Sequence, residues 1–65
     1  MTIEEVRAKV EAIARQSFDD EVAHSAEDAL HEEVLTAIAK GAENPAQLAH
    51  EALQTVGIEF SRWCA

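Results

Sequence analysis

The feature that most constrains the fold of this chain is how few of its residues interrupt a helix. Two glycines and one proline occur in 65 residues, at Gly41, Gly57 and Pro45. Alanine supplies 13 residues, and alanine and glutamate are both strong helix formers. The composition therefore favours helix throughout and predicts an all-α fold, in which the two glycines end helices.

The length allows a single domain over residues 1–65 and limits its core. A chain of this size buries only about 60% of its unfolded surface, and small domains usually need disulfides, a metal or oligomerisation. The single cysteine, Cys64, cannot form an intramolecular disulfide. A lone thiol suits a reducing compartment, and the charged N-terminal stretch is unlike a signal peptide. We therefore expect a cytoplasmic protein.

The first helix is predicted to run from about residue 3 to residue 16. Thr2 and Glu5 have the spacing of a capping box at its start. Apolar side chains recur at steps of three and four residues, at Ile3, Val6, Val10 and Ile13. This stripe either docks the helix against the rest of the domain or forms the seam of a homodimer. Two heptads are too few to establish a coiled coil, so both interpretations stay open.

The second helix is predicted to end near Lys40, with Gly41 as a left-handed stop. Its start is ambiguous, because it begins at Asp19 or Asp20 if it is continuous, or at Ser25 if the capping-like spacing there breaks it. Phe18, in the preceding turn, is expected to staple the first helix to the second. The core face of the second half comprises Leu30, Val34, Leu35 and Ile38.

A third helix is predicted over residues 45–55. Asn44 is expected to cap it, Pro45 occupies the first helical position, and Gln47 stands at the capping-box position. Its inward residues are expected to be Leu48, Ala52, Leu53 and Val56. The remaining segment is either an extended strap with Ile58 and Phe60 facing the core, or a short helical turn from Ser61. The residues expected to dominate the core are Ile3, Val6, Val10, Ile13, Leu30, Val34, Ile38, Leu48, Leu53 and Trp63.

The negative charge of the chain is concentrated in the second helix. Seven carboxylates lie within fifteen residues, at Asp19, Asp20, Glu21, Glu27, Asp28, Glu32 and Glu33. No Lys or Arg occurs from residue 16 to residue 39, so this stretch supplies seven of the eight net negative charges. At 1.5 Å per residue the density is about one charge per 3 Å, roughly half that of duplex DNA. On a continuous helix, Glu21, Asp28 and Glu32 line the face opposite the core.

This acidic stretch has two interpretations. Its carboxylates either imitate a phosphate backbone toward a basic groove on a nucleic-acid-handling protein, or form a solvated face that keeps a small protein soluble. Acids near a helix N-terminus also stabilise the helix through its dipole. In the first interpretation Phe60 and Trp63 are candidate anchors of the contact. The charge argues against direct binding of nucleic acid or of an anionic membrane.

Metal binding and catalysis are not expected from the remaining polar residues. His24, Glu27 and His31 would share one helix face, and imidazole and carboxylate are zinc ligands. The two histidines would be about 10 Å apart, however, too far for one ion to bridge, so a pair between His31 and Glu27 is favoured. A nucleophilic thiol needs a nearby base in a defined pocket, whereas Cys64 is one residue from the end of the given sequence, where a backbone usually frays. We expect no metal, no cofactor and no enzymatic activity.

The spacing of small and apolar residues from residue 34 to residue 63 resembles the three-helix core of helix-turn-helix domains. The matching positions are Leu35, Ile38, Gly41, Leu48, Ala49 and Gly57. The resemblance implies the packing of the second and third helices and, for a regulator, a recognition helix over residues 60–65. That segment carries one Arg, whereas a DNA reader needs a positive footprint. The resemblance therefore indicates packing without the DNA-binding function.

In size, acidity and lack of a catalytic motif, the chain is also similar to small phage-encoded inhibitors of the anti-CRISPR and anti-restriction type. This likeness implies a protein that binds a basic host partner and blocks it by steric and electrostatic contact. A dimeric adaptor module, whose acidity only keeps it soluble, is the first alternative. A helix-turn-helix transcriptional regulator is the second.

Overall fold

The computed structural model describes residues 1–62 of the chain. Over these residues the fold is all-α, as predicted, with no strand. The elements are α1 (Ile3–Arg15), α2 (Asp20–Ala39), α3 (Pro45–Ala52) and the short 3₁₀ helix η1 (Leu53–Gly57). Trp63, which was expected in the core and at a partner contact, lies outside the described residues.

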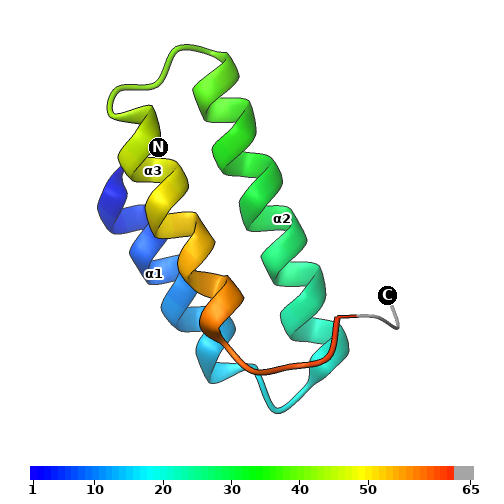
Figure 1. Ribbon diagram of the computed structural model, residues 1–65. Helices are drawn as coiled ribbons and strands as arrows, with labels where there is room; N and C mark the ends of the chain where they lie inside the picture. The colour runs from blue at the N-terminus through cyan, green and yellow to red at the C-terminus, as the bar shows by residue number, and fades with distance from the viewer. Residues whose placement is uncertain (63–65) are drawn as a thin grey trace.

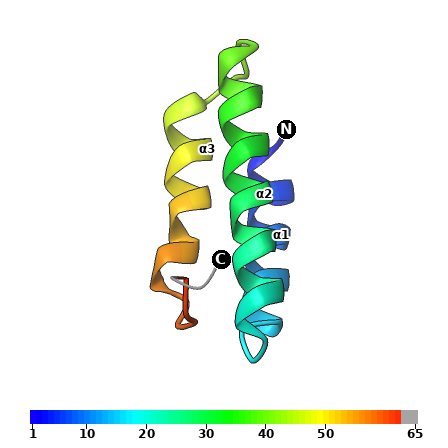
Figure 2. The ribbon, with the colours of Figure 1, turned by 90° about the vertical axis from the view of Figure 1, so that its right-hand side faces the viewer.

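The three α-helices form an antiparallel bundle in which each helix packs against the other two. Figures 1 and 2 show the chain running down α1, up α2 and down α3. After η1, residues 58–62 cross the end of the bundle toward the N-terminal part of α2 (Figure 1). We call this segment the C-terminal strap. The bundle is elongated, with extents of 33 × 19 × 14 Å.

The predicted capping box of α1 is confirmed. The Glu5 amide donates to Thr2 Oγ1 at 3.1 Å, and the Thr2 amide donates to Glu5 Oε1 at 3.1 Å. A helix N-terminus leaves four amides without an intrahelical partner, and this motif provides side-chain acceptors for two of them, those of Thr2 and Glu5. The helix ends at Arg15, one residue before the predicted end.

Helix α2 is continuous through Ser25, which decides between the two predicted starts. Asp19 caps it, since its Oδ1 accepts from the Val22 amide at 3.2 Å. Gly41 follows the C-terminal end with a φ of 87°, the left-handed conformation predicted for it. Phe18 is not the predicted staple, because it is 88% exposed in the turn that joins α1 to α2.

Helix α3 begins at Pro45 as predicted, but its cap differs from the prediction. Asn44 has a φ of 55°, in the left-handed region, and its side chain makes no capping bond. A capping side chain normally requires an extended backbone at the cap residue, so the left-handed conformation of Asn44 explains the missing bond. Gln47 correspondingly completes no capping box.

The end of the third helix tightens into η1, and this corrects two predicted core residues. A 3₁₀ helix has three residues per turn, so it presents a different residue inward from an α-helix of the same sequence. Thr55 is fully buried, whereas Leu53 is 58% and Val56 is 64% exposed. Leu53 and Val56 had both been predicted to face the core. Leu35 of α2, also placed on the core face, is 65% exposed because Val34 occupies the inward position.

The core lies along the axis of the bundle and contains most of the predicted residues. Its fully buried apolar members are Val6, Ile13, Ala23, Leu30, Val34, Leu48 and Ala52. Ile3, Val10 and Ile38 are partly buried against this cluster. The apolar stripe of α1 therefore packs inside its own chain. In the described part of the chain, no helix has the length and apolar character needed to cross a membrane.

Candidate binding surface

The seven carboxylates of the acidic stretch do not form one equivalent set. Asp19 is the cap of α2, and Asp20 Oδ1 accepts from the Ser61 amide of the C-terminal strap at 3.0 Å. Glu27 is the exception, because it is 5% exposed while the other six are exposed. Its assignment to an accessible partner-binding face was wrong, and its contacts explain why.

Glu27 forms a two-point ion pair with Arg62 of the C-terminal strap. Arg62 Nε donates to Glu27 Oε1 at 2.8 Å, and Arg62 Nη2 donates to Glu27 Oε2 at 3.0 Å. The same guanidinium donates to the backbone carbonyls of Thr55, Ile58 and Phe60 at 2.9–3.1 Å. A carboxylate can lie inside this small bundle because its charge is compensated and hydrogen-bonded.

This pair shifts the pKa values of both groups toward their charged forms. Hydrogen bonding to Arg62 holds the pKa of Glu27 below its ordinary value, although burial acts in the opposite direction. Hydrogen bonding to Glu27 likewise raises the pKa of Arg62. The pair is therefore ionised at neutral pH, and the sole Lys or Arg after Lys40 is engaged in folding the chain.

The C-terminal strap is not helical over residues 58–62, in agreement with the strap interpretation, whereas the alternative turn from Ser61 falls mostly outside the described residues. Ile58 and Phe60 are partly buried against the core, as the strap interpretation required. The guanidinium carbon of Arg62 lies 3.8 Å from the centroid of the Phe60 ring, a cation–π contact. Phe60, predicted as a partner anchor, is thus half-buried beneath an internal contact. The segment that resembled a recognition helix is not helical over residues 60–62.

The remaining carboxylates lie on the surface of α2. Glu21, Asp28 and Glu32, spaced by seven and four residues, are all exposed on the side of the helix away from the core. Asp28 lies 3.5 Å from His24 Nε2, and Glu33 lies 3.4 Å from Lys9 Nζ on α1. We call Glu21, Asp28 and Glu32 the outer acidic face. Removing Glu27 from the stretch lowers its charge density to about one per 4 Å of helix.

The two histidines of α2 have different partners and do not form a common site. His31 Nε2 lies 3.2 Å from the Ala52 carbonyl oxygen and 3.0 Å from Thr55 Oγ1. The predicted pair between His31 and Glu27 is replaced by these bonds to α3 and η1. His24 instead faces Asp28. No group of three potential metal ligands comes together among residues 1–62.

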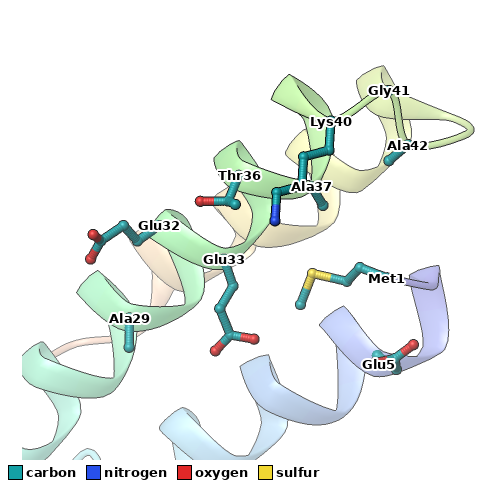
Figure 3. Close-up of a pocket in the computed structure, with 10 residues that line it drawn as sticks. All are labelled: Met1, Glu5, Ala29, Glu32, Glu33, Thr36, Ala37, Lys40, Gly41 and Ala42. Carbon is teal, nitrogen blue, oxygen red and sulfur yellow. The ribbon is translucent and has the colours of Figure 1, made fainter.

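An open depression of about 780 Å³ lies between the start of α1 and the second half of α2 (Figure 3). The Met1 side chain and the Glu33 carboxylate point into the space between the two helices, whereas the Glu32 carboxylate points away from it (Figure 3). Lys40 and Thr36 complete its polar lining. Its charged lining comprises Glu5, Glu32, Glu33 and Lys40, beside the flexible thioether of Met1, and it offers no nucleophile beside a base.

Sequence reasoning missed Arg62 as the partner of Glu27. The two residues are 35 positions apart, so no local pattern connects them. One signal was present: from residue 41 to residue 65 the chain has one Lys or Arg, facing an excess of acids. This lone cation was a candidate for an ion pair, but the acids of its own segment are Glu43, Glu51 and Glu59, so the count did not point to Glu27.

Comparison with protein-family models, with curated proteins and with solved structures gives no match to this chain.

Proposed function

We propose that this chain is a small, non-enzymatic protein that binds a basic partner protein in the cytoplasm and inhibits or modulates it. The observation that carries the proposal is the outer acidic face. Glu21, Asp28 and Glu32 project from one side of a rigid 20-residue helix that contains no Lys or Arg. A negative field of this kind steers encounter with a positive surface and fixes the orientation of the complex.

Because Glu27 is buried, the proposal concerns only the other carboxylates of the acidic stretch. Six of the seven carboxylates remain exposed, and Lys9 of α1 pairs with Glu33. The outer acidic face thus retains its charge in the folded chain. A partner that binds nucleic acid, whose groove already accepts a line of phosphates, has the matching surface. An inhibitor of the anti-CRISPR or anti-restriction type would use such a match.

The test compares two triple variants that change the net charge by the same amount. In the first, Glu21→Gln, Asp28→Asn and Glu32→Gln neutralise the outer acidic face. In the control, Glu4→Gln, Glu43→Gln and Glu59→Gln neutralise three exposed acids outside α2. Immobilised wild type and both variants are incubated with cell extract at low and high salt, and retained proteins are identified by mass spectrometry.

The proposal expects wild type and the control variant to retain the same basic protein at low salt. The outer-face variant loses it, and high salt releases it from wild type and the control variant, because exposed charges are screened within about 10 Å at 0.1 M. If both variants retain the same partner as wild type, the acidity serves solubility alone. The adaptor interpretation then replaces the inhibitor.

A further inference from the structure

Three of the exposed large apolar side chains lie on the two elements that border one seam of the bundle. Leu35 on α2 and Leu53 and Val56 on η1 are each more than half exposed. Isolated exposed apolar residues are common, but a group along one seam suggests a contact surface. Their positions relative to the seam follow from the contacts of their sequence neighbours.

On α2, the contacts of consecutive residues show which way Leu35 faces. Glu33 pairs with Lys9 of α1, and Val34 is buried in the core. Successive residues of an α-helix are rotated by about 100°, so Leu35 continues the same rotation and faces the α3 side. His31, one turn earlier on that side, bonds to Ala52 and Thr55. Leu35 therefore lies at the outer edge of the boundary between α2 and α3.

The same argument places Leu53 on the opposite edge of this boundary. Glu51 pairs with Arg7 of α1, and Ala52 is buried. The next residue, Leu53, consequently faces the α2 side. Side chains three residues apart eclipse each other in a 3₁₀ helix, so Val56 lies above Leu53 along η1. Figures 1 and 2 show α2 running antiparallel beside α3 and η1 over this region.

The boundary is apolar on the η1 side and acidic on the α2 side. Asp28, Glu32 and Leu35 are spaced i, i+4 and i+7, so they form one stripe along α2. No Lys or Arg occurs from residue 16 to residue 39 or from residue 41 to residue 61. Arg62 bridges Glu27 of α2 and the Thr55 carbonyl of η1 at the end of this boundary, where its charge is already paired. We call the surface formed by Asp28, Glu32, Leu35, Leu53 and Val56 the α2–α3 seam.

We propose that the α2–α3 seam binds an amphipathic basic helix of the partner protein. Apolar side chains of that helix, at i, i+3 or i+4, and i+7, pack on Leu35, Leu53 and Val56, the spacing by which amphipathic helices are generally recognised. Its Lys and Arg side chains meet Asp28 and Glu32. A second copy of this chain is the poorer occupant, because it carries a net charge of −8 and its own seam has no Lys or Arg.

This inference rests on the proposed function and names the structural class of its partner. The test uses a 14-residue probe peptide with four leucines on one helical face and lysines elsewhere. A scrambled isomer of identical composition, without an apolar face, is the control peptide. Binding is followed by ¹⁵N–¹H NMR titration of the full chain, which reports both the affinity and the residues contacted.

The proposal expects chemical-shift changes at residues 28–35 and 53–56, and at least tenfold weaker binding of the scrambled isomer. The double variant Leu35→Gln, Leu53→Gln weakens binding of the first peptide at least tenfold. The matched variant Phe18→Gln, Val22→Gln removes two exposed apolar residues at the other end of α2 and leaves the affinity unchanged. Unperturbed spectra of each free variant establish that it is folded.

Equal binding of both peptides, or unchanged affinity in the Leu35/Leu53 variant, would overturn the proposal. The proposal would also be overturned if the peptide did not bind and sedimentation equilibrium showed a dimer of the wild-type chain that the Leu35/Leu53 variant abolishes. The two proposals fail separately. If only the outer-face variant loses binding, the proposed function stands and the α2–α3 seam is rejected. If only the Leu35/Leu53 variant loses binding, the apolar seam stands and the acidic contact is rejected.

Discussion

At the scale of single residues, Glu27 shows how one side chain can belong to a charged pattern and yet have a different role. The other six acids of the stretch are exposed, but Glu27 is 5% exposed and bound at two points by Arg62. Removing one partner from such a pair leaves the other charge without compensation. The pair therefore has more influence on folding than the exposed ion pairs of the surface, which contribute little.

The variant Glu27→Gln is expected to lower the free energy of unfolding by about 1.5–3 kcal/mol, the range for a hydrogen bond to a charged group. The amide keeps the shape of the side chain, but it has no negative charge and one of its two terminal atoms is an NH2 group that cannot accept from the guanidinium. Urea denaturation followed by circular dichroism measures the change. Glu59→Gln, on the exposed side of the C-terminal strap, is the matched control and should leave stability within about 0.5 kcal/mol of wild type.

The contribution of Glu27 should also depend on pH. Its pKa is lowered by Arg62 from an ordinary value of 4.5, so the folded state is favoured above that value, and this stability is lost as pH falls through the folded-state pKa. The stability gap between wild type and Glu27→Gln should therefore narrow below about pH 4.5. Denaturation of both proteins from pH 7 to pH 3 measures the gap. A gap that stays constant contradicts the assigned pair.

At the scale of elements, the two glycines end their helices with different backbone conformations. Both were expected to end helices. Gly41 adopts a φ of 87° after α2, whereas Gly57 ends η1 without a positive φ. Neither has an atom within 4 Å of an added Cβ. Substitution at either site is therefore governed by backbone conformation alone.

Gly41→Ala and Gly57→Ala are expected to change stability in opposite directions. Alanine in the left-handed region costs about 1–2 kcal/mol, so Gly41→Ala should destabilise the chain. Gly57→Ala should stabilise it by about 0.4–1 kcal/mol, because alanine restricts the unfolded chain without straining the folded one. Thermal and urea denaturation of the two single variants provides the measurement. A loss of stability in both would show that the turn after η1 is also specific for glycine.

At the scale of the whole molecule, the excess of acids opposes compaction of the bundle. The chain carries 13 Asp and Glu against five Lys and Arg, and repulsion between like charges destabilises a compact state. The ion pairs that α1 forms with Glu33 and Glu51 offset only part of this repulsion. The same charge that suits a basic partner is thus unfavourable for the isolated chain.

Salt is consequently expected to stabilise the isolated protein while it weakens the proposed complex. Raising NaCl from 10 to 300 mM shortens the screening length severalfold and should raise the midpoint of thermal unfolding. The variant Glu21→Lys, Glu32→Lys, which reduces the net charge from −8 to −4 by two changes of two units each, should respond less. A midpoint that falls with salt in wild type would indicate that attractive ion pairs outweigh the repulsion.

The sequence by itself determined the local elements of this protein. The capping box of Thr2 and Glu5, the proline at the start of α3, the left-handed Gly41 and the apolar stripe of α1 all depend on residues within a few positions of each other. Local hydrogen bonding and backbone preference fix such features. They were therefore predictable, and with them the all-α class and the exposed outer acidic face.

Tertiary structure alone decided which residues of these elements face one another. The burial of Glu27 depends on Arg62, 35 positions later, and the exposure of Leu35, Leu53 and Val56 depends on how α2 and α3 pack and on the tightening of α3 into η1. A helical period specifies an apolar face only to within one residue at its edges. Long-range packing sets those edges, and in this protein they decide both the binding surface and the charge that it presents.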